Sequence, residues 1–391
     1  MNLELIGITI YVLGMLYVGY HVSKRIKSED DYFLAGRSLG PVLATFSIFA
    51  TWFGAESCIG TSGKVYRDGL AGAHADPFGY SFCIVIMALF FARTLWNKQI
   101  TTLPDLFRRR YSVNVERVAA VIMIPSSLIW AGAQIRAFGQ IIHVSSAFPV
   151  GPAVTVAANV VILYTMFGGL LADAYNDLIQ GVCIMVGLTL LLIVMLVKVG
   201  GPVQAFEIIS QNGGFNFFHL EKVSWGARWE MWLVPILGSI MSQELVSRVS
   251  ASKSADVAVH SAWRAAGIYL LVGLIPVLIG LLGPHFHQGV AESDSIMPLL
   301  AKTHLNPFLY VIFVGALVAA ILSTVDSTLL TVSALLSHNL ITPQFPRMAE
   351  KHKVRLARGA VVSSGLIAYG IALSGMSVTD MVETASSLGG P

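Results

Sequence analysis

Hydroxyl and carboxyl groups gather in the middle of an otherwise apolar segment at residues 307–336. The polar members of this cluster are Ser323, Thr324, Asp326, Ser327 and Thr328. The segment is long enough to cross a bilayer, where such groups raise the free energy unless a partner or ligand satisfies them. An oxygen-rich pocket at this depth suits a hard cation. The alternative for Ser323 and Thr324 is hydrogen bonding to backbone carbonyls one turn earlier.

A second polar stretch interrupts the apolar segment at 40–62. Gly54 and Ala55 lie near its centre and are followed by the carboxylate of Glu56 and the hydroxyl of Ser57. This pattern predicts a break in the helix, where unwound backbone carbonyls can turn toward an ion. Close helix packing through the same small residues is the alternative.

These clusters must be positioned by membrane-spanning helices, because the composition leaves little room for a soluble domain. Hydrophobic residues make up 55% of the 391 residues, charged residues 12%, and the mean hydropathy is +0.71. We predict ten spans, at 3–22, 40–62, 77–96, 117–140, 144–168, 178–199, 230–247, 263–283, 307–336 and 357–375. Cys58, Cys83 and Cys183 all fall within these spans and predict no disulfide.

Most of the 25 Lys and Arg residues fall in alternate connections between the predicted spans. They occupy the stretches 24–37, 93–117, 248–264 and 347–358. The positive-inside rule makes this side cytoplasmic and places the N-terminus outside. We therefore expect a multi-pass protein of the plasma membrane, in bacteria the inner membrane. The net charge of +3 reflects this asymmetry and does not indicate nucleic-acid binding.

The sequence shows no pattern typical of nucleotide hydrolysis or of enzymatic catalysis. The stretch Gly60-Thr-Ser-Gly63-Lys64 lacks the spacing of a phosphate-binding loop. No Ser/His/Asp or metal-ligand spacing is present, and His285 and His287 fall in a predicted outer loop, where a solvated surface is expected. We expect a protein that is not an enzyme and whose work is driven by an ion gradient.

Five motifs, taken together, resemble the sodium:solute symporter family, which includes proline, sugar and sialic acid carriers. They are Gly36-Arg-Ser-Leu-Gly-Pro41; Ala50-Thr51-Trp52; Gly168-Gly169-Leu-Leu-Ala172 with Asn176-Asp177-Leu-Ile-Gln180; Arg248 with Ala251-Ser-Lys-Ser254; and Ala320-x-x-Ser323-Thr324. The resemblance runs over essentially the whole chain, in the order and spacing of the family.

The resemblance implies an all-α membrane protein with a LeuT-type fold in a single domain, 1–391. A peripheral helix, here 3–22, precedes two five-helix inverted repeats, here 40–199 and 230–391, and discontinuous helices hold ion and solute near the membrane midplane. About ten transmembrane helices are present. Only residues 377–391 remain for the eleventh helix, so the second repeat is incomplete and we expect the chain to be truncated relative to its family.

By the same resemblance, backbone carbonyls and hydroxyls of two helices hold one sodium ion. The implied ligands are the carbonyls of Ala50, Phe53 and Ala320 and the hydroxyls of Ser323 and Thr324. Five neutral oxygens in a confined pocket suit sodium. In some relatives a second sodium ion lies between an aspartate, here Asp177, and serines of the ninth helix, here Ser327. A helix N-cap formed by Asp177 with Asn176 is the alternative.

Tryptophan residues in the predicted spans bear on the chemical class of the solute. Trp52, Trp130 and the segment 77–80 resemble the high-affinity choline carriers, in which tryptophans hold a quaternary ammonium by cation–π attraction. The chain departs from that branch at Ser242, which replaces a tryptophan and is followed by Gln243 and Glu244. An incomplete aromatic cage weakens the interpretation as a choline carrier.

Glu56 and Glu244 fall at predicted membrane depth, at pseudo-equivalent places in the two repeats. Each should pair with a cation, bind a proton or reach a water-filled cavity, which favours an amine-bearing or cationic solute. The alternative pairs Glu244 with Arg248 and leaves Glu56 near the outer vestibule. Gln134 and Arg136 could instead meet a substrate carboxylate, and a zwitterion would satisfy both sets.

We therefore predict a secondary active transporter that couples sodium to a small polar organic solute, an amino acid or an amine, by alternating access. The predicted solute-binding residues are Trp52, Glu56, Trp130, Gln134, Ser242, Gln243 and Glu244. The alternative is a membrane sensory input module derived from the same fold.

Overall fold

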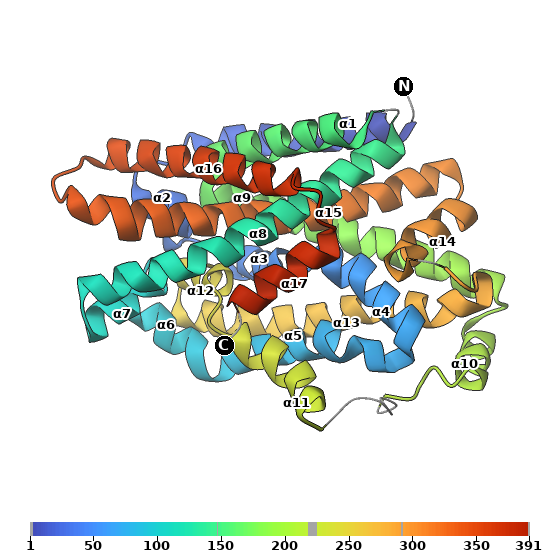
Figure 1. Ribbon diagram of the computed structural model, residues 1–391. Helices are drawn as coiled ribbons and strands as arrows, with labels where there is room; N and C mark the ends of the chain where they lie inside the picture. Colours follow the sequence, from blue (N-terminus) through green and yellow to red (C-terminus); the bar gives the residue numbers. More distant parts are fainter. Residues whose placement is uncertain (1–2, 147, 218–224, 291, 390–391) are drawn as a thin grey trace.

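The computed structural model describes residues 3–146, 148–217, 225–290 and 292–389, which form helices and no β-strand beyond a single bridge between Leu39 and Ser252. The long helices lie side by side in one elongated bundle (Figure 1). The all-α class predicted from the sequence is therefore confirmed.

The helices differ widely in length. Those of the first half are α1 (Leu3–Ser23), α2 (Glu29–Leu34), α3 (Pro41–Trp52), α4 (Thr61–Asp68), α5 (Tyr80–Ile86), α6 (Ala92–Lys98), α7 (Pro104–Arg110), α8 (Val113–Ser145) and α9 (Val150–Lys198). Those of the second half are α10 (Pro202–Gln211), α11 (Trp225–Leu233), α12 (Gln243–Ala251), α13 (Ala255–Phe286), α14 (Ile296–His304), α15 (Pro307–Ala334), α16 (Glu350–Ala372) and α17 (Val378–Gly389). The π-helical turns η2 (Glu56–Gly60), η6 (Val234–Gly238) and η8 (Leu335–Ile341) connect some of them.

Six stretches of the described residues are long and apolar enough to cross a membrane. They are Leu3–Ser23, Glu56–Lys98, Val113–Ser145, Val150–Lys198, Ala255–Phe286 and Pro307–Gln344. The predicted count of ten spans is not confirmed. Two predicted spans, 144–168 and 178–199, fall on the single element α9, and those at 40–62 and 230–247 are broken near their centres.

A glycine divides α9 into two helical segments, 150–168 and 170–198. Gly169 has φ 56° and ψ −177°, a backbone conformation that favours glycine. A β-carbon at this position would lie 2.8 Å from the backbone oxygen of Tyr32 in α2. The predicted connection at 169–177 is therefore wrong in length, because residues 170–177 are already helical.

Two further helices are interrupted inside the bundle. In the first, α3 ends at Trp52, Phe53 has the non-helical angles φ −88° and ψ 71°, and the chain turns helical again at Ala55. The predicted break thus lies at Phe53 and Gly54. In the second, residues 239–241 form a turn after η6, and Ser242 caps α12 by accepting a hydrogen bond from the amide of Leu245 at 3.4 Å. Interrupted backbone within a membrane must find its hydrogen-bond partners in protein or in a water-filled cavity.

The centre of α15 is the most enclosed part of the bundle. Every residue from 316 to 334 is buried. The helix packs mainly against α9 and α8, and at the contact with α9 the absence of a side chain at Gly187 leaves room for Ala316. Small residues at such contacts let helix backbones approach closely. The polar cluster on α15 is therefore surrounded by protein and not by lipid.

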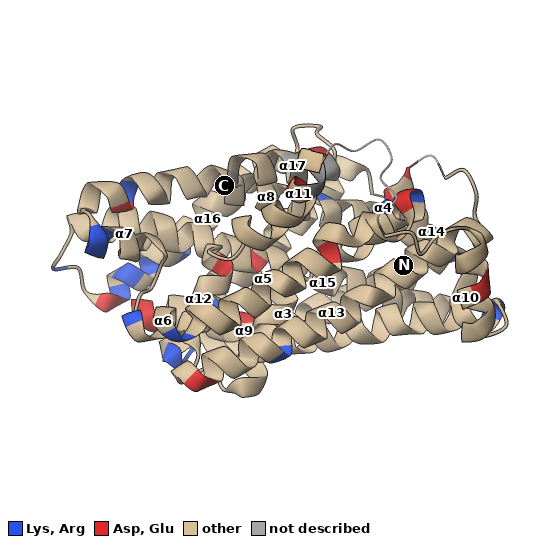
Figure 2. Cartoon of the chain, turned by 90° about the horizontal axis from the view of Figure 1, so that it is seen from below, with Lys and Arg blue, Asp and Glu red and all other residues tan. Residues whose placement is uncertain are grey.

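Basic side chains gather at one end of the bundle. Figure 2 shows that Lys and Arg concentrate around α6 and α7, while the end that carries α10 and α14 has few. This is the asymmetry on which the positive-inside rule rests. The assignment of the basic end to the cytoplasm remains a prediction.

A buried polar network ties several elements together at the basic end. Asn339 of η8 donates hydrogen bonds to Asp105 at 3.1 Å and to Glu116 at 2.9 Å. His338 contacts Glu29 at 3.2 Å and Asp105 at 3.3 Å. Burial raises the pKa of Asp105, but hydrogen bonds from His338 and from backbone amides outweigh it and hold the pKa at about 2. The network joins α2, α7 and α8 to η8.

Replacing Gly169 by alanine should destabilise the protein by roughly 1–3 kcal/mol, because a β-carbon at positive φ would also press against Tyr32. The measurement is the apparent unfolding temperature of the purified protein in detergent. Gly315→Ala in α15 is the matched control, since its β-carbon would meet nothing within 4 Å. Equal unfolding temperatures for the two variants would contradict the assigned role of Gly169.

Candidate functional site

The break in α3 lies directly against the polar centre of α15. A β-carbon at Gly54 would lie 2.7 Å from the hydroxyl oxygen of Thr324. Ser323 and Thr324 each donate a hydrogen bond to the carbonyl of Ala320, at 3.0 and 3.1 Å. The two polar stretches that the sequence singles out therefore meet at one place.

The oxygen atoms predicted to bind sodium are buried at this contact. Ala50, Phe53, Ala320 and Ser323 have no exposed surface, and Thr324 is 5% exposed. The two bonds to the carbonyl of Ala320 are those of the back-bonding alternative, yet a hydroxyl that donates its proton keeps its lone pairs for a cation. Neutral carbonyl and hydroxyl oxygens of this kind suit sodium. The chemistry of these residues thus fits the ion, and their role as ligands remains a prediction.

A second polar cluster lies one turn further along α15. Arg248 of α12 donates hydrogen bonds to Asp173 of α9 and to Ser327 of α15, and the side chains of the ion pair are each 1% exposed. The hydroxyl of Ser47 donates to the carboxylate of Asp177 at 2.6 Å. Asp177 and Ser327, predicted for a second sodium ion, therefore both belong to this cluster, which already contains the positive charge of Arg248.

Arg248 pairs with Asp173, a partner that was not predicted from the sequence. Glu244 was the alternative expected, but the described ion pairs join Arg248 to Asp173 and not to Glu244. The reason is orientation, because Arg248 is buried toward α9 while Glu244 faces a cavity. The available signal was a carboxylate at Asp173, one turn before Asp177 in an apolar helix.

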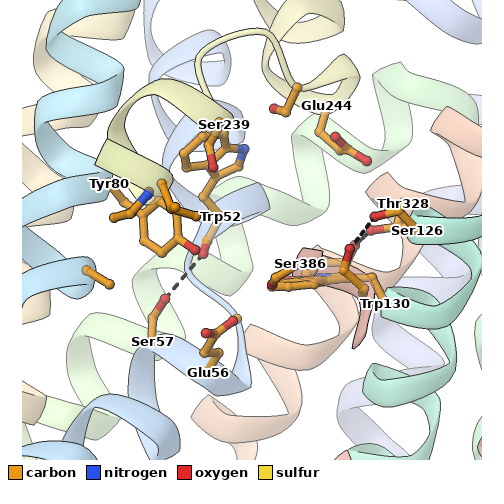
Figure 3. Close-up of a pocket in the computed structure, with 18 of the residues that line it drawn as sticks. Trp52, Glu56, Ser57, Tyr80, Ser126, Trp130, Ser239, Glu244, Thr328 and Ser386 are labelled. Atoms are coloured by element: carbon orange, nitrogen blue, oxygen red, sulfur yellow. Dashed lines mark hydrogen bonds between the residues drawn. The ribbon is translucent and has the colours of Figure 1, made fainter. Parts of the chain in front are cut away.

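A cavity of about 550 Å³ opens beside the break in α3 (Figure 3). Six of the seven residues predicted to bind the solute line it. They are Trp52, Glu56, Trp130, Gln134, Ser242 and Glu244. The cavity wall also includes Gly54 and Thr324, so the cavity and the predicted sodium ligands share a boundary.

Gln243 does not line this cavity. Its side chain is 2% exposed, accepts a hydrogen bond from the amide of Leu103 at 2.6 Å and donates one to the carbonyl of Thr101 at 3.4 Å. Successive residues of a helix point about 100° apart, so Glu244 and Gln243 face different neighbours. We therefore assign Gln243 to the packing of the connection before α7 and not to solute binding.

Aromatic side chains stand on two sides of the cavity. The rings of Trp52 and Tyr80 meet edge to face, with centroids 5.5 Å apart and an interplanar angle of 84°. Trp130 of α8 lies on the other side in the close-up (Figure 3). Aromatic faces attract organic cations, most strongly where water is excluded.

The charged groups of the cavity wall are all acidic. Glu56, Glu230 and Glu244 line it, and none of the described lining residues is Lys, Arg or His. Arg136, expected as an alternative partner for a substrate carboxylate, donates instead to the carbonyl of Ala372 at 2.8 Å. The cavity thus offers an organic cation several negative partners and offers an organic anion only neutral donors.

Some lining residues were missed by the sequence analysis. They are Glu230, Ser126, Ser239 and Ser386, together with others of small or apolar type. Glu230 carried a usable signal, because it is a carboxylate at the start of the predicted span 230–247. Single serines in apolar helices carry none, since most of them bond to their own helix.

Residues 32–391 match the family model described as the sodium:solute symporter family. The chain is 27% identical to high-affinity choline transporter 1 of Caenorhabditis elegans, over 96% of this chain and 69% of that protein. It is 28% identical to the human high affinity choline transporter 1, over 98% and 70% of the two chains. The sodium/proline symporter of Escherichia coli is 25% identical, over 94% and 76%. The chain thus spans about two thirds of the length of these choline transporters.

Solved structures support the fold. A Na⁺-coupled sialic acid symporter in a substrate-bound, outward-open state matches with a TM-score of 0.88 at 19% identity, over 100% of this chain and 84% of that chain. A nucleobase-cation-symport-1 family transporter in a closed conformation matches with a TM-score of 0.63 at 14% identity, over 91% and 77%. The helical arrangement is therefore that of sodium and cation symporters.

Replacing Gly54 by alanine should weaken sodium binding, because the β-carbon would displace the hydroxyl of Thr324. The expected result is a roughly tenfold higher sodium concentration for half-maximal thermal stabilisation of the purified protein, with KCl as the ionic-strength reference. Gly315→Ala, with open space around its β-carbon, should respond like the parent protein. An unchanged sodium response in Gly54→Ala would show that the break in α3 takes no part in sodium binding.

Proposed function

The chain belongs to the sodium:solute symporter family, and from this premise we propose that it couples the uptake of a small amine-bearing organic solute to the entry of sodium. Binding of sodium stabilises the arrangement that accepts the solute, and the two repeats then rock to expose both to the other side of the membrane. The LeuT-type arrangement of repeats 40–199 and 230–391 is part of this proposal. The named relatives are transporters and symporters, which favours a carrier over a sensory module.

One observation carries the proposal. Gly54 and Thr324 line the solute cavity and also touch each other across the break in α3. An ion bound by the hydroxyls of α15 and the carbonyls of α3 would therefore fix the wall against which the solute rests. Two ligands that order the same wall favour each other's binding, which is the thermodynamic requirement for coupling.

The sodium ion would be held by neutral oxygens of two helices. The proposed ligands are the carbonyls of Ala50, Phe53 and Ala320 and the hydroxyls of Ser323 and Thr324. A second sodium ion at Asp177 and Ser327 is a separate proposal. Arg248 competes with it for the hydroxyl of Ser327, so the ratio of sodium to solute flux decides whether a second ion takes part.

The solute would be recognised by charge and by aromatic faces. Glu56 and Glu244 supply negative charge, Trp52 and Trp130 supply aromatic surface, and Gln134 supplies an amide. Because no basic side chain lines the described cavity, an amine is favoured over a sugar acid or another anion. The relatives are named as choline transporters and sodium/proline symporters, and these names support the proposal of a small organic solute.

The membrane setting follows from the same membership. The chain is a multi-pass membrane protein, given its family and its six apolar spans among the described residues. We propose the plasma membrane, in bacteria the inner membrane, with the N-terminus outside and the basic end around α6 and α7 in the cytoplasm. The gathering of Lys and Arg at that end supports this orientation (Figure 2).

Sodium coupling predicts that proteoliposomes accumulate a labelled amine such as choline or butylamine only under an inward sodium gradient. In the variants Ser323→Ala and Thr324→Ala, the sodium concentration for half-maximal uptake should rise roughly tenfold or more, because a ligand of the ion is lost. Ser337→Ala is the control, since this buried hydroxyl bonds only to the carbonyl of Ser333. Uptake that does not depend on the sodium gradient would contradict coupling. Equal losses of uptake in all three variants would mean that Ser323 and Thr324 contribute to packing and not to sodium binding.

A further inference from the structure

Two carboxylates of the cavity occupy matching positions in the two interrupted helices. Glu56 is the first residue of η2, directly after the break in α3, and Glu244 is the second residue of α12, directly after the turn at 239–241. Both therefore lie in the first turn of a helical segment. The amide dipoles of a first turn stabilise negative charge. The dipole stabilises negative charge in part, but a half-buried carboxylate still needs a positive partner.

Neither carboxylate has a basic partner among the described residues. The described ion pairs include none to Glu56 or Glu244, and Arg248, one turn beyond Glu244, is paired with Asp173. Lys64, two turns beyond Glu56, is exposed and is absent from the same set of ion pairs. A carboxylate at this depth requires a cation or access to water, and both side chains face the cavity. The partner that the protein lacks must come from the cavity's contents.

The two carboxylates approach the cavity from opposite sides. In the close-up, Glu56 and Glu244 lie at opposite ends of the space, with Trp52 and Trp130 on the walls between them (Figure 3). The aromatic walls suit methylene groups as well as ammonium groups. The cavity therefore has a carboxylate at each of two opposite ends and aromatic walls between them.

On this geometry, and resting on the proposed symport function, we infer that the solute is an organic dication, a diamine. One ammonium group lies against Glu56, the other lies against Glu244, and the carbon chain passes between Trp52 and Trp130. A diamine with a short methylene chain is smaller than the cavity of about 550 Å³.

Other solute classes leave a charge unmatched. A monoamine or a quaternary ammonium reaches one carboxylate and leaves the second without a partner. A zwitterion brings its own carboxylate into a wall whose described charges are all negative, and like charges repel. The third carboxylate of the wall, Glu230, is exposed and can be satisfied by water. A dication is therefore the solute class that satisfies both half-buried ends.

The coupling sodium does not replace the second ammonium group. Its proposed ligands lie on the side of α15 next to the aspartate cluster, where Ser327 donates to the carbonyl of Ser323 at 2.7 Å. That cluster holds Asp173, Asp177 and Asp326, all buried, against the single Arg248. None of the proposed sodium ligands is Glu56 or Glu244, so the cavity carboxylates remain for the solute.

The test compares putrescine with butylamine, which have the same carbon chain and differ in one ammonium group, and includes choline. Each amine competes with labelled putrescine for binding to the purified full-length protein in saturating NaCl. The parent protein should bind putrescine at least about tenfold more tightly than butylamine or choline. Glu56→Gln and Glu244→Gln should each reduce this preference to less than about twofold while leaving butylamine binding within a few fold.

Two controls keep the outcome decisive. Glu207→Gln, an exposed carboxylate on α10 far from the cavity wall, should keep the full preference for putrescine. Sodium-induced thermal stabilisation of Glu56→Gln and Glu244→Gln shows that each variant is folded and still binds the ion.

The outcomes separate this inference from the proposed function. If the parent protein binds butylamine or choline as tightly as putrescine, or if both glutamine variants keep the preference, the solute is not a dication. Sodium-driven uptake of a monoamine would then still support the proposed symport function. Tight binding of proline or of a sugar acid in place of every amine overturns the inference as well. If no solute shows sodium-dependent uptake, the proposed function falls together with it.

Discussion

A helix that stops inside an apolar bundle exposes amide and carbonyl groups that lipid cannot satisfy, and the whole arrangement depends on this constraint. Within the described residues, helices stop in this way after Trp52 and before Ser242. Around these two points lie the fully enclosed centre of α15, rich in hydroxyl groups, and the cavity that faces the restarted helices. The small residue at Gly187 brings α9 close enough to α15 to exclude lipid from that centre.

The same residue types serve opposite purposes at two places in the bundle. Asp173 and Arg248 satisfy each other in a dry environment, where removal of either partner would leave an unpaired charge. Glu56 and Glu244 have no such partner among the described residues and face an open space. The first arrangement stabilises a contact between α9 and α12. The second arrangement leaves two carboxylates whose negative charge a bound ligand can offset. The unpaired charge lowers local stability without a ligand and favours ligand binding.

The sequence was informative wherever a polar residue stood in strong contrast to its neighbours. The hydroxyls at Ser323 and Thr324 and the break beside Gly54 were visible for that reason, and so were Glu56, Gln134 and Glu244 of the cavity wall. The break beginning at Gly169 was also placed correctly between two predicted spans, but the length of the connection was not, because the residues after Gly169 resume the helix at once. The partner of Arg248 and the separation of Gln243 from Glu244 depend on tertiary contacts with α9 and with residues 101–103, which local patterns do not contain.

Helix α12 is nine residues long and rigid, and its first turn contacts two distant parts of the molecule at once. Glu244 faces the cavity, while its neighbour Gln243 is bonded to the backbone of Leu103, which leads directly into α7 and the Asp105 network at the basic end. A displacement of Glu244 would therefore also be felt at the start of α7, because both contacts belong to one helical turn. The first turn of α12 thus connects the cavity wall to the basic end of the bundle without passing through the contact between α3 and α15.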